Sequence, residues 1–246
     1  MKAAPEEQRR LLDLQAIDTN LQQLDHRRKT LPQISAANTL TRHLSELDDE
    51  RVKAQVGVDD IDRDINRLER DIEQVRARSD KDSGRLTAGT GPARELEALQ
   101  HELTSLRRRQ SELEDSELEL MEQRETAQAA VDDVIGRLAA GRDELTKIEA
   151  ERDAAFAEIA KDEEWKVNAR KPLAADLPAD LVALYDKIRE SSGGLGAALL
   201  RSGRCGGCRI ELSGGERARV KAAAADEVVR CDECRRIMIR TEESGL

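Results

Sequence analysis

The residues with the clearest chemical potential are four cysteines, which form two CxxC pairs within the last 42 residues of the chain. Cys205 and Cys208 form one pair, and Cys231 and Cys234 form the other, 22 residues further on. A CxxC knuckle aims two sulfurs at one point, and four thiolates at about 2.3 Å complete the tetrahedron that zinc prefers. The spacing therefore predicts one structural Zn²⁺ ion. Four protein ligands leave no open position, so we do not expect catalytic zinc.

The alternative for these cysteines is redox chemistry. A redox CxxC follows a strand in a βαβ unit, and no such unit precedes Cys205. The chain has no apolar run long enough to cross a membrane, and its N-terminus lacks the apolar core of a signal peptide. We therefore expect a cytoplasmic protein that does not contact membranes, in a reducing compartment that favours metal over disulfide.

Arginines crowd the region of the cysteines. They are Arg201, Arg204, Arg209, Arg230, Arg235, Arg236 and Arg240. One interpretation is a phosphate-binding face. The other is charge balance, since zinc with four thiolates carries a formal charge of about −2. No aromatic residue follows Leu195 to stack on a base. We take Arg204, Arg209, Arg235 and Arg236 as candidate partner contacts.

Other motifs give no support to catalysis. The segment LSGGE, from Leu212 to Glu216, resembles the signature of ABC-type ATPases, but the chain has no GxxxxGK[ST] loop to bind phosphates. We expect Ser213 to Gly215 to form a turn before a helix. The three histidines are far apart along the helices, and no serine or cysteine lies beside a recognisable base. We therefore expect no enzyme activity and no small-molecule substrate.

The composition indicates which elements carry these residues. Of 246 residues, 37% are charged and 1% are aromatic, which is typical of long helices with narrow apolar seams. Apolar residues alternate in steps of three and four from Ala37 to Val75 and again from Leu96 to Ile159, the pattern of a coiled coil. A shorter register, from Leu14 to Leu31, precedes Pro32, which should kink or break the first helix.

These registers predict an intramolecular antiparallel hairpin in residues 1–166, with a tip loop at 80–91. Folding back at that loop pairs residues whose numbers add to roughly 171. It places Arg51 near Glu117, and Pro32 opposite Gly136 and Gly141. The tip is locally basic, and we take Arg76, Arg78, Lys81 and Arg85 as candidate partner contacts. We expect a monomer rather than a dimer.

Beyond the hairpin, residues 167–194 are predicted to form a linker and a short helix. Leu181, Leu184, Tyr185 and Ile188 share one face of that helix. Residues 195–246 are predicted to form a zinc ribbon with strands in LGAALLR, CRIEL, EVVRC and RRIMIR, and a helix in ERARVKAAAAD. The fold class is mainly α, a long antiparallel coiled-coil hairpin with a small C-terminal β zinc ribbon.

Two stretches carry a family resemblance. YDKIRESSGGLGAALLRSGRCGGC with VVRCDECRRIMIR, and KDSGRLTAGTGPARELEALQHELTSLRRRQSELEDSELELME, are similar to bacterial coiled-coil proteins with a four-cysteine zinc ribbon, especially their actinobacterial branch. The resemblance implies that the four cysteines bind zinc. Arg235 departs from the glycine often found after the last cysteine, at a position that favours positive φ.

Relatives in that family resemble flagellar or secretion chaperones. They bind protein partners and, in one branch, a messenger RNA and a sigma factor. The resemblance therefore implies an adaptor or chaperone-like scaffold that binds a protein client. The alternative is a zinc ribbon that binds RNA or DNA, with the coiled coil as a spacer.

Overall fold

The computed structural model describes residues 1–246, which divide into two compact units. The hairpin unit is Ser35–Glu149, and the ribbon unit combines Met1–Ile34 with Ala150–Leu246. The N-terminal segment therefore belongs with the zinc ribbon. This grouping corrects the predicted division into a hairpin of residues 1–166 and a separate ribbon of residues 195–246.

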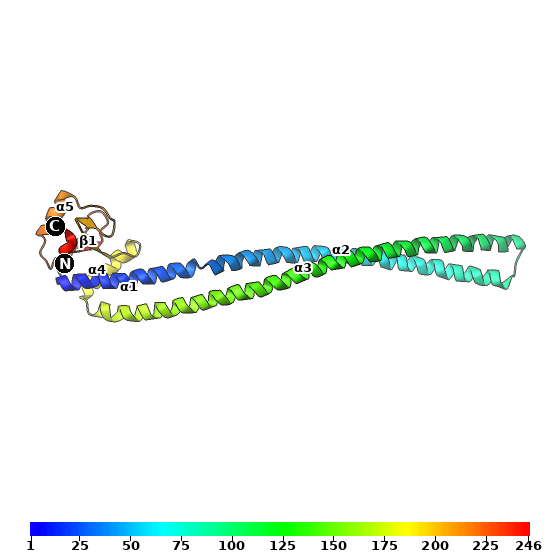
Figure 1. Cartoon of the computed structure of the whole chain (residues 1–246), viewed down its shortest axis with the longest axis horizontal. Coiled ribbons are helices and arrows are strands. Elements are labelled where there is room, and N and C mark those ends of the chain that lie inside the picture. Colours follow the sequence, from blue (N-terminus) through cyan, green and yellow to red (C-terminus); the bar gives the residue numbers. More distant parts are fainter. The chain divides into compact units, whose positions relative to one another are not determined.

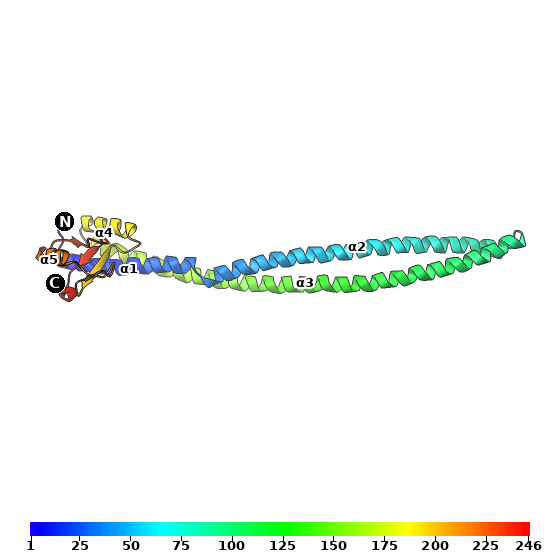
Figure 2. The ribbon, with the colours of Figure 1, turned by 90° about the horizontal axis from the view of Figure 1, so that it is seen from above.

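The hairpin unit consists of most of two antiparallel helices, α2 (Pro32–Ala88) and α3 (Ala93–Ala175), of which α3 continues into the ribbon unit. Within the hairpin unit the two helices lie side by side in both views (Figures 1 and 2). Every position of the two predicted registers is buried or half-buried. Leu47, Val134 and Leu138 form one cluster of this seam. The coiled-coil prediction is confirmed, because residues spaced by three and four lie on the face that each helix turns to its partner.

The tip is shorter than predicted. Helix α2 continues to Ala88, and the chain turns through Gly89 and Gly91, whose φ values of 62° and 149° suit glycine. The loop prediction for residues 80–88 is therefore wrong. The spacing of three and four continues through half-buried Ser79 and buried Asp82. Because both side chains are polar, a pattern based on apolar residues does not detect this part of the helix.

This later turn shifts the pairing register. Arg124 donates to Asp62 at 2.6 Å, and Arg137 lies 3.4 Å from Glu50. Facing residues in this part of the hairpin have numbers that add to about 186, against the predicted sum of 171. The helices are antiparallel as predicted, but the predicted register is wrong by about four turns of helix.

Two predicted pairings fail for this reason. Arg51 pairs with Asp48 of its own helix at 3.0 Å instead of lying near Glu117. A Cβ on Gly141 would lie 2.7 Å from the Leu44 side chain, so Gly141 faces Leu44 and not Pro32.

The predicted break at Pro32 is confirmed. Helix α1 (Pro5–Lys29) ends two residues before Leu31, and α2 begins at Pro32. Proline is well placed at a first helical position, where its missing N–H is not needed.

Helix α3 extends further than predicted. It continues to Ala175, so residues 167–175 are helix and not linker. The seam positions here are polar, and half-buried Glu163, Lys166 and Arg170 follow the spacing without apolar side chains. Pro172 lies so close to the helix end that it removes few backbone bonds. Helix α4 (Ala179–Ser191) buries Leu181, Tyr185 and Ile188, with Leu184 packed beside them, as predicted.

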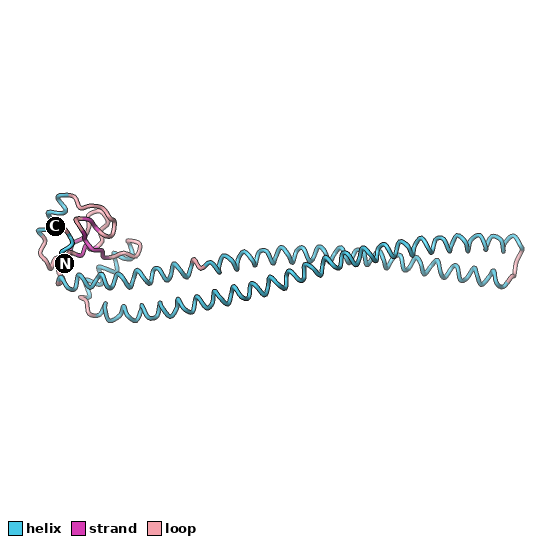
Figure 3. The backbone as a smooth tube through the Cα atoms, in the orientation of Figure 1, coloured by secondary structure: helices cyan, strands magenta, loops and turns pink.

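The ribbon contains a four-stranded sheet in the order β2-β1-β4-β3. The strands are β1 (Ala197–Arg201), β2 (Arg204–Cys205), β3 (Val229–Arg230) and β4 (Ile237–Ile239), drawn in magenta in Figure 3. Strand β1 is antiparallel to β2 and parallel to β4, and β3 is antiparallel to β4. Three predicted strands are confirmed. The strand predicted in CRIEL (residues 208–212) is wrong, because this segment contributes only an isolated bridge at Glu211, while β2 lies just before it.

Two short helices complete the ribbon. Helix α5 (Gly214–Ala222) starts two residues earlier and ends four residues earlier than predicted, and the 3-10 helix η1 (Glu242–Ser244) lies near the C-terminus. None of the helices combines the length and the apolar character that crossing a membrane requires.

The core of the ribbon unit explains why the N-terminus belongs to it. Leu11 and Leu14 of α1 are fully buried and pack in one cluster with Tyr185 of α4 and Ile237 of β4. The first residues also extend the ribbon, because the Ala3 N–H donates to the backbone carbonyl of residue 226 at 2.8 Å. The ribbon is therefore anchored on α1 and α4.

Candidate metal centre

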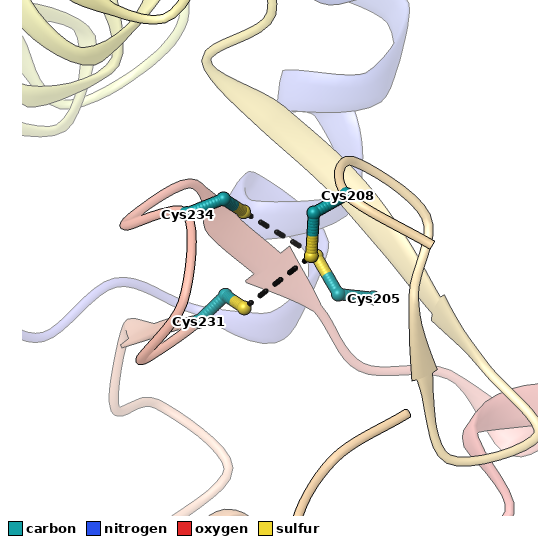
Figure 4. Close-up of side chains that lie close together, drawn as sticks. All are labelled: Cys205, Cys208, Cys231 and Cys234. Atoms are coloured by element: carbon teal, nitrogen blue, oxygen red, sulfur yellow. Dashed lines mark hydrogen bonds between the residues drawn. The ribbon is translucent and has the colours of Figure 1, made fainter. Parts of the chain in front are cut away.

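The four cysteine sulfurs converge on one point (Figure 4). Cys205 Sγ lies 3.8 Å from Cys234 Sγ, Cys208 Sγ lies 3.9 Å from Cys231 Sγ, and all four lie within 4.8 Å of one another. Zinc at the centre of a tetrahedron with Zn–S bonds of about 2.3 Å requires sulfur–sulfur edges of about 3.8 Å. The four sulfurs therefore fit one structural zinc ion, as predicted. When bound, zinc would link the two knuckles to each other.

The two knuckles share one backbone design. The Arg209 N–H donates to the Cys205 carbonyl at 2.7 Å, and the Arg235 N–H donates to the Cys231 carbonyl at 2.9 Å. Both arginines adopt the left-handed conformation, with φ values of 63° and 62°. The positive φ expected at Arg235 is confirmed, and Arg209 matches it. An arginine costs about 1 kcal/mol more than glycine in such a conformation.

Burial and hydrogen bonds set the acidity of the thiols. Burial raises the pKa of Cys205 and of Cys231. Burial acts in the same direction on Cys234, but hydrogen bonds from Arg236 and from the Cys208 and Cys231 thiols together outweigh it and lower the pKa of that thiol. Since zinc binds thiolates, metal binding must displace protons from the buried cysteines.

Two of the ribbon arginines are structural. The Arg236 guanidinium donates to the carbonyls of Leu195 at 2.9 Å and Ser192 at 2.7 Å, which ties the second knuckle to the segment after α4. The Arg240 guanidinium donates to five carbonyls between Val220 and Glu227, at 2.6 to 3.3 Å. Arg240 thus satisfies the end of α5, where helical carbonyls lack partners.

The LSGGE segment supports the second knuckle. Ser213 caps α5, and its Oγ accepts from the Glu216 N–H at 3.2 Å. The turn predicted at Ser213 to Gly215 is therefore confirmed only at Ser213, because Gly214 and Gly215 already belong to the helix. Glu216 is buried, and its Oε1 accepts from the Asp232 N–H at 2.9 Å. The motif therefore connects a helix cap to the loop between Cys231 and Cys234.

Comparison with known proteins agrees with this combination of elements. The sequence profile of the CT398-like coiled coil hairpin domain matches residues 14–193, and that of the C4-type zinc ribbon domain matches residues 204–238. The chain belongs to the CT398-like family. The protein Rv2229c of Mycobacterium tuberculosis is 40% identical to this CT398-like chain over 242 residues, which cover 98% of both.

Solved structures show the same fold. A structure from Mycobacterium smegmatis is similar with a TM-score of 0.88 and 38% identity, over 98% of this chain and 100% of that one. The structure of CT398 from Chlamydia trachomatis is similar with a TM-score of 0.70 and 17% identity, over 95% of this chain and 97% of that one. At 17% identity, the similarity to CT398 shows a shared fold and nothing more.

The other ribbon cations of this CT398-like chain divide into two groups. One group is engaged within the ribbon: Arg201 with Glu243, Arg204 with Glu211, Arg217 with the Gly245 carbonyl and Arg219 with Asp232. The other group is exposed and has neither an ion pair nor a side-chain hydrogen bond: Arg209, Lys221, Arg230 and Arg235. Of the predicted contacts, Arg209 and Arg235 are therefore available to a partner, whereas Arg204 and Arg236 have partners within the ribbon unit.

The predicted tip contacts are mostly engaged within the hairpin unit. Arg76 pairs with Glu114, Arg78 with Glu102 and Asp82, and Arg85 with Asp82. Lys81 is exposed and unpaired. The cluster is therefore a set of ion pairs with one free cation.

A buried carboxylate, which the sequence did not indicate, holds the ribbon unit together. Asp18 of α1 is 3% exposed. It accepts from Arg170 Nε at 2.7 Å and from Tyr185 Oη at 2.8 Å. Arg170 also donates to Asp186 at 2.6 Å, and Arg189 lies 3.5 Å from Asp18. No local signal reveals this network, because Arg170 follows Asp18 by 152 residues.

Trp165 of α3 is largely exposed to solvent. Its side chain is 64% exposed, and its ring lies 4.7 Å from Lys166 Nζ.

Proposed function

We propose that this zinc-binding coiled-coil protein is a non-enzymatic adaptor or chaperone-like scaffold that binds protein partners through the hairpin tip and the zinc ribbon. A closed four-cysteine site stabilises a fold and offers no coordination position to a substrate. The same site fixes two knuckles whose outer side chains are left free for a partner.

The observation that carries the proposal is a groove between α2 and α3 near the tip, with a volume of about 350 Å³. Val75, Leu106 and Leu113 supply its apolar lining, and charges of both signs come from Asp71, Arg78 and Arg109. A groove between two helices that lie side by side is open along its length, unlike the enclosed concave sites that hold small molecules. An amphipathic segment of a protein fits this shape, with apolar anchors between the helices and polar groups toward the charged residues of the groove.

Exposed apolar side chains elsewhere on the hairpin unit favour the same class of partner. Val52 and Val56 on α2 are 47% and 51% exposed, and Leu118 and Met121 on α3 are 60% and 47% exposed. Each pair is spaced so that its members share a helical face outside the seam. Large apolar groups of this kind favour contact with proteins over contact with phosphates.

A photo-crosslinking amino acid at Gln74, a groove residue, tests the proposal in the native cytoplasm, with and without nuclease. We expect a protein adduct that survives nuclease. Arg109→Glu should weaken the adduct, because Arg109 lines the groove. Arg108→Glu is the matched control, because both arginines contact Glu112 but only Arg109 lines the groove. Adducts that require nucleic acid, or equal effects of both variants, would reject the proposal.

A nucleic-acid-binding ribbon is the second candidate. Arg209, Arg230 and Arg235 favour it, because they are unpaired and each neighbours a zinc-ligating cysteine in the sequence. The nuclease arm of the experiment distinguishes the two candidates.

A further inference from the structure

The surface around the two zinc knuckles differs from the rest of the ribbon because three of its arginine side chains have no ion-pair or hydrogen-bond partner within the protein. Of the ten cations after Leu195, six are engaged within the ribbon unit and four are not. Of these four, Lys221 lies on α5, whereas Arg209, Arg230 and Arg235 border the knuckles. Arg209 directly follows Cys208, Arg230 directly precedes Cys231, and Arg235 directly follows Cys234. The unpaired arginines therefore gather at the metal centre.

Backbone conformation adds a second, independent observation. Arg209 and Arg235 are two of only three non-glycine residues with positive φ in the chain. Glycine adopts this conformation without strain, whereas arginine does not. Each strained position thus carries a long cationic side chain that has neither an ion pair nor a hydrogen bond within the protein. The knuckle requires this conformation but does not require arginine, so the choice of residue is a reason to look for a function.

The first knuckle also exposes an apolar side chain. Ile210 follows Arg209, is 50% exposed, and is the one large hydrophobic residue of the ribbon that is exposed to this extent. Its carbonyl accepts from the Cys205 N–H at 3.0 Å, so its backbone is fixed by the knuckle. The knuckle therefore presents a cation and an apolar group next to each other on a rigid support.

From this surface, and resting on the proposed adaptor function, we infer that Arg209, Ile210, Arg230 and Arg235 dock a protein segment that alternates acidic and apolar residues. The arginines pair with its carboxylates, and Ile210 contacts an apolar side chain between them. One feature favours such a segment over a nucleic acid, because the ribbon has no aromatic side chain to stack on a base.

Purified full-length protein with zinc bound provides the test, with three fluorescent probes read by anisotropy. The probes are a peptide that repeats Asp-Leu-Glu-Leu, the same peptide with Asn and Gln in place of Asp and Glu, and a single-stranded RNA oligomer. We expect the acidic peptide to bind more tightly than its amide counterpart, with an affinity that falls as salt rises. Weak or equal binding of the two peptides would overturn the inference.

The decisive variant combines R209G, R230Q and R235G. It should weaken acidic-peptide binding about tenfold, since three exposed ion pairs of modest strength are lost. The control removes three cations that are already paired and combines R201Q, R204Q and R219Q. It should change the affinity by less than about twofold, because its net charge matches but its cations are not free.

Zinc content and melting temperature separate binding from structure. Because glycine suits both knuckle positions, the decisive variant should keep its zinc and melt no lower than the wild type. Loss of zinc would instead assign the arginines to charge balance at the thiolates. Preferential RNA binding that the decisive variant abolishes would assign the surface to nucleic acid. A client that binds only in the hairpin groove would overturn this inference but would still support the proposed adaptor function.

Discussion

Replacing Asp18 with alanine tests whether the buried carboxylate holds the ribbon unit together. The change removes the acceptor of Arg170 Nε at 2.7 Å and of Tyr185 Oη at 2.8 Å. Arg170 keeps its contact with Asp186 at 2.6 Å, so its charge is not left wholly unpaired. The Tyr185 hydroxyl, by contrast, loses the only side-chain acceptor given by the structure, in a residue that is fully buried.

The expected loss of stability follows from these contacts. Breaking a buried ion pair by removing one partner costs about 3–5 kcal/mol. The remaining Asp186 contact places Asp18→Ala near the lower end, at about 3 kcal/mol. For a unit of this size, such a loss lowers the melting temperature by about 6–12 °C. Tyr185→Phe removes one hydrogen bond and should cost about 1 kcal/mol, and the double variant should cost less than the sum.

Thermal release of zinc to a chromophoric chelator measures the ribbon unit separately from the helical signal of the hairpin. Asp25→Ala is the matched control on α1, since Asp25 is exposed and pairs with Lys29 at 2.7 Å. It should cost less than about 0.5 kcal/mol. Equal shifts in Asp18→Ala and Asp25→Ala would refute the assignment of Asp18 as the central contact.

Three further predictions concern the metal, the register and the end of α5. Zinc occupancy should fall as the pH is lowered, because protons compete for thiolates and burial raises the pKa of two of the four thiols. Elemental analysis after acid titration measures the occupancy, and zinc retained in acid would contradict the prediction. Cysteines introduced at Leu44 and Gly141 should be joined within one chain by a short crosslinker, because these positions face each other. Cysteines at Leu68 and Leu103 should not be joined, because the observed register places these two positions roughly 20 Å apart along the hairpin. Arg240→Met should leave carbonyls after α5 unsatisfied and cost about 2–3 kcal/mol, which denaturant unfolding monitored by zinc release would show, with Lys221→Met as the exposed control.

The sequence by itself determined the features that depend on local spacing. The alternation of apolar residues predicted both helices of the hairpin, because residues three and four apart share a helical face. The two CxxC pairs predicted the zinc ligands, because a knuckle is built within a few residues. The helical break before Pro32 was predictable for the same reason, since proline constrains its own backbone.

Only the tertiary structure decided how distant segments meet. Asp82 and Arg170 occupy seam positions with polar side chains, so an apolar pattern stops before the helices do. The position of the turn then sets the register of every pair in the hairpin, and an error at the tip propagates along its length. Asp18 gained its role from residues more than 150 positions away. Which knuckle arginines stay free likewise depends on carbonyls and carboxylates that folding brings within reach, and no spacing along the chain specifies that outcome.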